Sequence, residues 1–230
     1  MIEEVVASKV ESTKVFCYEG LLVRLRPQNV ETDFDQVMKW VNDPEITKFL
    51  KINPPITRED EMQYFQSKVG KNNEALFAID TLDGEFIGNM GIHNINWRSR
   101  EGGTGSLIGN KEYWGKGYGA DAKMLVLYHA FYCLGLHRIS SSVYDFNGRS
   151  YSCLEKTGYV REGVKRNSIF AEGKFHDRYM YGILEDEFKA IWPGYKEIID
   201  LSGELSKDEI SERAKSFFKD VREKNLADQL

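Results

Sequence analysis

The chain has 230 residues and a formal net charge of −5, with 31 lysines and arginines against 36 aspartates and glutamates. This length suits one domain with short extensions, and a hydrophobic content of 41% is enough to bury a core. Because no overall positive field would attract a phosphate backbone, the composition argues against nucleic acid as a partner.

The first residues and the cysteines predict a reduced protein of the cytoplasm. Residues 1–4 are acidic at positions 3 and 4 and precede no apolar run, so we expect no secretory signal. The longest largely apolar stretch, 124–136, is too short for a membrane span, which needs about 20 apolar residues. Three widely spaced cysteines make no disulfide framework, and no metal-ligand spacing occurs, so we expect no bound metal.

Hydrophobic patterning in the first half predicts strands interrupted by two helices. The expected strands cover residues 14–18, 21–26, 75–80, 85–93 and 104–109. Thr32 is predicted to cap the first helix, and Thr57 with Asp60 to open the second in a capping box. Val69 is placed on the apolar face of that second helix. The polar residues 97–103 are expected to form a loop.

The second half is predicted to alternate helices and strands and to end in a helical tail. A helix is expected over 120–134, a strand over 138–143, a helix capped by Asn147 that ends at Thr157, and strands over 159–162 and 175–183. Residues 192–194, Trp-Pro-Gly, are expected to break the chain, and Ser206 with Glu209 to open a final amphipathic helix. This order indicates an α+β, or mixed α/β, fold with one central sheet.

A glycine-rich loop, residues 114–119 with the sequence Trp-Gly-Lys-Gly-Tyr-Gly, separates a predicted strand from a helix. Alternating glycines allow backbone N–H groups to converge, and the start of a helix adds unpaired donors and the positive end of its dipole. The loop therefore predicts an anion site, most naturally for a diphosphate. It lacks the residue order of a P-loop and comes too late in the chain for a dinucleotide-binding unit. A plain glycine turn is the alternative.

Three segments that occur in order resemble the GCN5-related N-acetyltransferases. They are residues 106–122, which contain the glycine loop, residues 146–163, and residues 175–184. Residues 40–47 resemble the ribosomal-protein N-acetyltransferase-like (RimJ/RimL-type) branch of that family. The resemblance implies an N-terminal extension over 1–20, an acetyltransferase domain over 21–190 and a C-terminal helical extension over 191–230.

The same resemblance implies acetyl-CoA (coenzyme A) as the cofactor. It implies a splayed, mostly antiparallel sheet with the cofactor between the strands at 104–109 and 138–143. The backbone N–H groups of the glycine loop would hold the pyrophosphate, and the main chain of 107–109 would pair with the pantetheine. The residues implied in binding are Leu107, Ile108, Gly109, Gly115, Lys116, Gly117, Tyr118, Gly119, Ala120, Asn147, Arg149 and Ser150.

Two positions depart from the family pattern for catalysis. The strand position that often carries a glutamate base in the family is Gly103 here, and Glu101, two residues earlier, is the nearest acid. The position that often carries a tyrosine acid is Leu154, so Ser150 becomes the candidate partner of the leaving thiolate; its alternative role is helix capping. His93 follows an apolar strand and is a further candidate to face the acceptor.

The resulting hypothesis is direct acetyl transfer from acetyl-CoA to a primary amine, either a protein N-terminus or a small amine, without a metal and away from membranes. Residues 28–73 and 93–103 are expected to line the acceptor site. The alternative is an acyl-CoA-binding regulatory or interaction module with little or no turnover, which Gly103 and Leu154 favour. The tail helix would pack either on its own domain or on a second copy in a homodimer.

Overall fold

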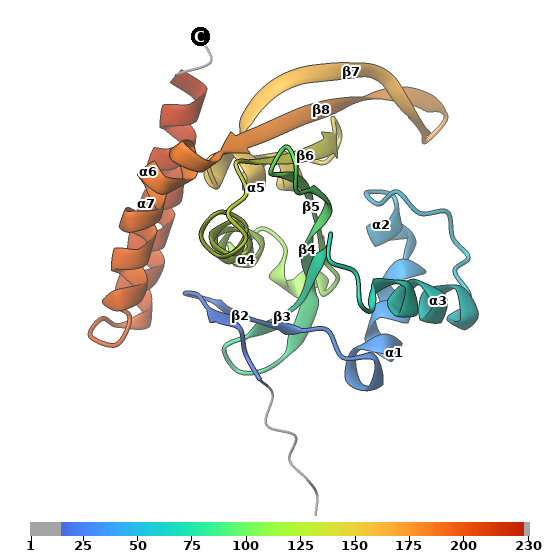
Figure 1. Ribbon diagram of the computed structural model, residues 1–230, viewed down its shortest axis with the longest axis horizontal. Helices are drawn as coiled ribbons and strands as arrows, with labels where there is room; N and C mark the ends of the chain where they lie inside the picture. Colours follow the sequence, from blue (N-terminus) through green and yellow to red (C-terminus); the bar gives the residue numbers. More distant parts are fainter. Residues whose placement is uncertain (1–14, 228–230) are drawn as a thin grey trace, which may run out of the picture.

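The computed structural model describes residues 15–227 and shows one sheet of eight strands within that range (Figure 1). The strands are β1 (Tyr18–Glu19), β2 (Val23–Pro27), β3 (Ala75–Thr81), β4 (Phe86–Asn96), β5 (Glu101–Ile108), β6 (Arg138–Tyr144), β7 (Val160–Ala171) and β8 (Lys174–Leu184). Their order in the sheet is β1-β2-β3-β4-β5-β6-β8-β7, and only β5 and β6 are parallel. The predicted mixed α/β class with one mostly antiparallel sheet is confirmed.

The sheet opens between β5 and β6. These two strands pair only from Glu101 to Gly103 on β5 and from Arg138 to Ser140 on β6. Beyond this point β6 continues along β8, whereas β5 continues along β4 as far as Ile108. The inner edges of the two strands therefore separate, which creates the splayed opening that the family resemblance implied.

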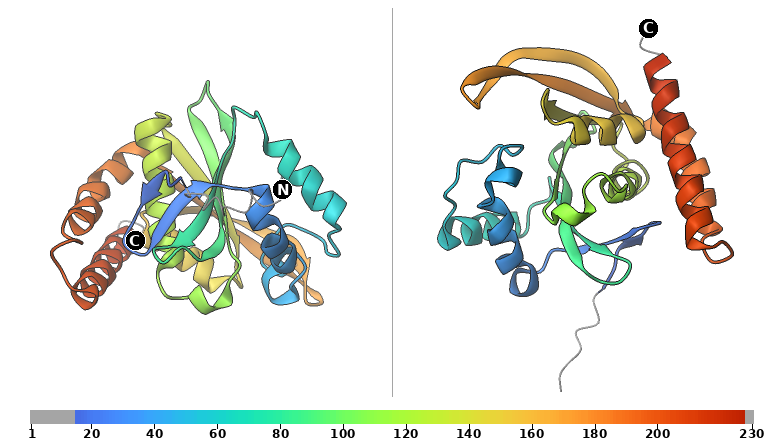
Figure 2. Two further views of the ribbon diagram at one scale, coloured as in Figure 1. Left: turned by 90° about the horizontal axis from the view of Figure 1, so that it is seen from below. Right: turned by 180° about the vertical axis from the view of Figure 1, so that it is seen from behind.

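Helices cover both faces of the sheet. They are α1 (Val30–Val41), α2 (Pro44–Thr47), α3 (Arg58–Lys68), α4 (Tyr118–Tyr128), α5 (Gly148–Lys156), α6 (Glu185–Asp200) and α7 (Lys207–Ala227). Figures 1 and 2 show α4 on one side of β4 and β5 and the group α1–α3 on the other. Each side has its own hydrophobic cluster: the larger joins α4–α7 to the sheet, and the smaller holds α1–α3. None of the helices in residues 15–227 is long and apolar enough to cross a membrane.

The first helices differ in part from the prediction. Helix α1 begins at Val30 because Asn29, in an extended conformation, accepts a 2.8 Å hydrogen bond from the Glu31 N–H; Thr32 therefore lies inside the helix and is not its cap. The Thr57–Asp60 capping box of α3 is confirmed. Val69 is 82% exposed because it follows the last helical residue, so its placement on the apolar face was wrong.

Several strands are longer or shorter than predicted. Only Tyr18 and Glu19 belong to β1, and position 14 of the predicted first strand lies outside the described residues. Residues 101–103 belong to β5 rather than to a loop, since β4 extends to Asn96 and pairs with Glu101. The last two strands form a hairpin over 160–184, and its residues near the tip are mostly exposed, so no apolar pattern marked them.

The C-terminal region is more helical than predicted. Helix α6 runs through 192–194 without a break, because buried Phe188, Tyr195 and Ile198 hold both halves against the core. After Tyr128 the helix of α4 continues as one π-helical turn over 129–133. The predicted Ser206–Glu209 capping box is present, with the Glu209 N–H donating to Ser206 Oγ at 3.3 Å. The domain boundaries at 20/21 and 190/191 stay predictions.

Helix α7 packs on its own chain. Phe218 and Val221 are each 7% exposed, and Phe218 belongs to the main core. Arg222 forms an ion pair with Glu155 on α5, with Arg222 Nη2 2.9 Å from Glu155 Oε2. The contacts of α7 with α5 and the core are those expected for a tail that packs on its own chain.

Candidate active site

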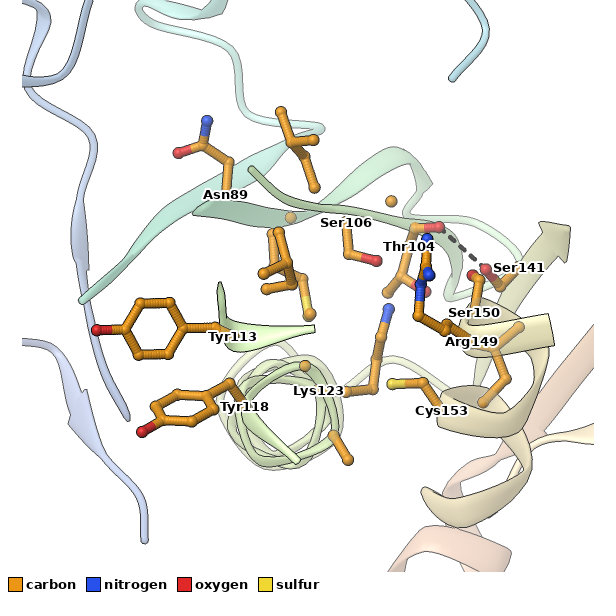
Figure 3. Close-up of a pocket in the computed structure, with 18 of the residues that line it drawn as sticks. Asn89, Thr104, Ser106, Tyr113, Tyr118, Lys123, Ser141, Arg149, Ser150 and Cys153 are labelled. Carbon is orange, nitrogen blue, oxygen red and sulfur yellow. Dashed lines mark hydrogen bonds between the residues drawn. The ribbon is translucent and has the colours of Figure 1, made fainter. Parts of the chain in front are cut away.

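The opening between β5 and β6 forms the floor of a large cleft with a volume of about 2020 Å³. Its lining comes from the glycine loop and α4, from α5 and β6, from α1–α3, and from α7. Figure 3 shows Ser106, Lys123, Ser150 and Cys153 around this space, contributed by β5, α4 and α5. The cleft thus unites segments that are distant in the sequence.

The glycine loop presents a row of unpaired donors. Gly115 and Gly117 have φ values of +75° and +95°, which only glycine adopts readily. The backbone N–H groups of residues 115–119 donate no hydrogen bond to any described residue. The Ala120 N–H, which the resemblance placed among the pyrophosphate donors, bonds the Gly117 carbonyl at 3.0 Å and is committed to the helix. The backbone donors available to an anion are therefore five consecutive groups, and they end at Gly119.

The edge of β5 offers only some of the predicted main-chain groups. The Gly109 N–H donates to the Ile87 carbonyl at 2.9 Å, so it is engaged with β4. The Ile108 carbonyl accepts from Trp114 Nε1 at 2.6 Å, on the side away from β4. Because the N–H and carbonyl of one strand residue point to the same side, the Ile108 N–H faces the opening, whereas the main chain of Leu107 faces β4. Leu107 contributes its side chain to the cleft wall.

The start of α5 carries the next group of predicted residues. Asn147 caps the helix, with its Oδ1 accepting from the Ser150 N–H at 3.2 Å. The Ser150 hydroxyl lines the cleft and makes no hydrogen bond with any described residue, so it is free to donate. The Arg149 guanidinium lies 4.0 Å from the centre of the Trp114 ring, which holds it over the entrance. Leu154 is 3% exposed and part of the core.

Lys123 was missed by the sequence reasoning. This residue of α4 is 1% exposed and makes no hydrogen bond or ion pair with any described residue; its ammonium lies 5.9 Å from the centre of the Tyr159 ring. Burial lowers the pKa of Lys123 to about 8. Burial raises the pKa of the Cys153 thiol, and the nearby Lys123 opposes that shift. The sequence did contain a sign of this buried lysine, because Lys123 is a charged residue within the otherwise mostly apolar helix α4.

The predicted acid and base residues are not all brought together. Glu101 is exposed at the start of β5 and is absent from the cleft wall, so the geometry does not support it as a base. His93 on β4 is half-buried, lines the cleft and lies opposite Gly103. Residues 175–177, part of the third segment that resembles the family, lie outside the cleft wall, and Phe175 is 61% exposed on the β7–β8 hairpin.

The lysines and carboxylates on the α2–α3 side are partly paired. Lys68 bonds Glu74 at 2.6 Å, and Asp60 is engaged with Thr57 in the capping box. Glu61 is 7% exposed and has no hydrogen bond or ion pair with any described residue; burial raises its pKa. Lys51 Nζ reaches across to Ser142 Oγ on β6 at 3.3 Å. No group of three potential metal-ligating side chains occurs within residues 15–227.

The fold places a helix N-terminus with unpaired N–H groups beside an open strand edge, an arrangement suited to an anionic ligand. The family model described as an acetyltransferase (GNAT) domain matches residues 23–160, more than half of the chain. The chain belongs to this family of acetyltransferases and is an acyltransferase. The finer RimJ/RimL-type assignment is not established by this match.

Relatives that match over most of their own length agree with the assignment. The N-acetyltransferase p20 of Bacillus licheniformis is 28% identical over 169 residues, which cover 71% of this chain and 93% of p20. Spermidine N(1)-acetyltransferase of Vibrio cholerae is 26% identical over 135 residues, covering 58% of this chain and 78% of that protein. A crystal structure of spermidine N-acetyltransferase from Vibrio cholerae with CoA and spermine has a TM-score of 0.68 at 22% identity, covering 73% and 98% of the two chains.

Proposed function

We propose that the protein transfers the acetyl group of acetyl-CoA directly to a primary amine. The observation that carries this proposal is the row of five unpaired N–H groups, residues 115–119, which adjoins the open edge of β5. A diphosphate bound by these groups leaves the rest of a linear ligand to enter the opening between β5 and β6. When bound, acetyl-CoA supplies an acetyl group that is activated as a thioester.

Three groups of this chain have roles that follow from their positions. The Ile108 N–H is directed into the opening and would donate to the acetyl carbonyl oxygen as negative charge develops on it. The Ser150 hydroxyl, free of partners among the described residues, would donate to the departing sulfur. The 3′-phosphate has Lys116, Arg149 and Lys156 as candidate cations at the cleft. The spacing of Asn147 and Ser150 supports a place in the RimJ/RimL-type branch.

Glu61 supports a small acceptor with a second positive charge. A buried carboxylate without a partner is unfavourable, and a cationic ligand in the cleft would relieve that cost. Because Asp60 and Glu74 already have partners, Glu61 is the carboxylate on the α2–α3 side of the cleft wall that is available to an ammonium group. The sequence similarity to a spermidine acetyltransferase is consistent with such an acceptor. We therefore infer that the acceptor is a diamine or polyamine rather than a protein N-terminus.

Calorimetric titration with acetyl-CoA tests the cofactor site. We expect binding by the wild type and loss of binding in Gly117→Glu, whose side chain adds a carboxylate to the anion site. Gly173→Glu is the matched control, because Gly173 has a similar φ of +80° in open space at the tip of the β7–β8 hairpin. Absence of binding by the wild type contradicts the proposed function and its non-catalytic alternative together.

Acetyl transfer to spermidine, butylamine and a short peptide with a free N-terminus tests the reaction. We expect transfer to spermidine, with a KM at least tenfold higher in Glu61→Gln and no such change for butylamine. Glu59→Gln, an exposed position outside the cleft on the same helix, serves as the control. Acetyl-CoA binding with no transfer to any of the three amines would favour the regulatory module.

A further inference from the structure

His93 fills the space that a side chain at position 103 would need. The two residues are paired across β4 and β5, and a Cβ built on Gly103 would lie 2.9 Å from His93 Nε2. A Cβ on Gly105, two residues further along the same face of β5, would lie 3.6 Å from His93 Cε1. The imidazole therefore packs on the part of β5 where Gly103 and Gly105 have no side chains, and this leaves room for the ring.

The contact between His93 and Gly103 lies at the point where β5 and β6 separate. Gly103 pairs with His93 on one side and with Ser140 of β6 on the other, and it is the last residue of β5 that β6 reaches. The next residues of β5 border the opening and include Ile108, whose N–H faces it. His93 lines the same cleft from the side of α2 and α3, where the acceptor is proposed to bind. The ring thus stands between the acceptor side and the opening.

The charges around His93 keep its ring neutral. Burial lowers the pKa of His93, and the ammonium groups of Lys51, after α2, and Lys123, on α4, add to that effect. Glu74, before β3, opposes it, and Lys68 on α3 lowers it further. The ring nitrogens make no hydrogen bond with any described residue, so a lone pair is available to a ligand or a water molecule. A neutral imidazole that lacks a partner is suited to accept a proton.

We propose that His93 is the general base of the acetyl transfer, an inference that rests on the proposed function. As the amine nitrogen bonds to the acetyl carbonyl carbon, its proton passes to a ring nitrogen of His93, directly or through one water. The carbon–sulfur bond then breaks, its electron pair stays on sulfur, and the thiolate takes up a proton. The imidazolium returns its proton to solvent, so the step is balanced without an oxidant or a metal.

The kinetic test compares His93→Gln with the wild type, with spermidine as the acceptor. We expect kcat/KM to fall at least a hundredfold, in the range typical for loss of a general base. The wild-type profile of kcat/KM should rise with a midpoint below pH 6.5, in addition to the rise due to the amine itself, and this component should vanish in His93→Gln. Acetyl-CoA affinity should change less than twofold. His137→Gln, at an exposed histidine outside the cleft, should keep full activity.

A readout that needs no turnover is the titration of the His93 ring by NMR. The ring signals that disappear in His93→Gln assign the residue, and their midpoint in the protein alone should lie below 6.5. Lys51→Met should raise that midpoint, since it removes a nearby positive charge. A midpoint at or above 6.5, or no response to Lys51→Met, contradicts the electrostatic part of the proposal.

Side chains at positions 93 and 103 would occupy the same space, and this allows a rescue experiment. In the double variant His93→Ala with Gly103→Glu, the new carboxylate can occupy the volume left by the imidazole, so we expect at least tenfold recovery over His93→Ala. Retention of the wild-type rate and pH profile in His93→Gln overturns the role of His93 while leaving the acetyltransferase proposal intact. Acetyl-CoA binding without transfer to any amine by the wild type overturns both.

Discussion

The Tyr195 hydroxyl donates a 2.5 Å hydrogen bond to Asp121 Oδ1, and this bond joins helix α6 to the first turn of α4. Asp121 is 1% exposed and also accepts from the backbone N–H groups of Leu21, Leu22 and Val23 at 2.9–3.1 Å. One carboxylate therefore ties the start of β2, the helix behind the glycine loop and α6 together. This junction lies in the first turn of α4, directly after the glycine loop.

We expect Asp121→Ala to destabilise the protein by about 3–5 kcal/mol, because it leaves three buried donors and one half-buried donor without an acceptor. Tyr195→Phe removes one hydrogen bond to a charged group and should cost about 1.5–3 kcal/mol. Urea unfolding measures both, and the double variant should cost less than the sum, since the residues are in contact. Full additivity would mean that the hydrogen bond contributes little.

Lys123→Met should stabilise the protein at pH 7 by about 3 kcal/mol. The pKa of Lys123 is lowered from 10.5 to about 8 in the folded state, a difference of about 2.5 units at 1.36 kcal/mol each. Between these values the unfolded state binds more protons, so the stability of the wild type rises with pH, and the advantage of the variant shrinks towards pH 10. Urea unfolding at pH 7 and pH 10 checks this, with exposed Lys116→Met as the control.

Gly109→Ala should cost about 1–3 kcal/mol and weaken acetyl-CoA binding. A Cβ at this position would overlap the Trp40 indole, so either α1 or the end of β5 must move. Replacing Trp40 by leucine in the same protein should recover part of the affinity, because it frees the space. Gly163→Ala, where a Cβ meets open space, is the control for thermal unfolding and calorimetry.

Glu155 on α5 holds α7 in place. Its carboxylate accepts from Arg222 at 3.0 Å and from the Tyr181 hydroxyl at 3.0 Å, and its carbonyl accepts from Asn225 Nδ2 at 3.1 Å. We expect Arg222→Met to speed amide hydrogen exchange in α7 about tenfold, with little change in β3 and β4. Uniform acceleration throughout the protein would show that α7 opens only with global unfolding.

Local patterns predicted much of the fold. The Thr57–Asp60 and Ser206–Glu209 boxes, the Asn147 cap and the glycine loop depend on residues within a few positions of each other. The α6 helix was missed because proline is unfavourable inside a helix on its own, and tertiary packing of Phe188 and Tyr195 outweighs that cost. The outer part of the β7–β8 hairpin was missed because exposed strands lack an apolar repeat.

The amino-acid sequence by itself determined the family, the glycine loop before α4 and the class of fold, because each is encoded in short segments with a fixed order. Only the tertiary structure decided which side chains share the cleft. The pairing of His93 with Gly103 follows from strand register, and the approach of Lys123 to Cys153 follows from the packing of α4 against α5. Glu101 was nearer in sequence to the expected base position, but register and the splay of β5 from β6 bring His93 to the cleft instead.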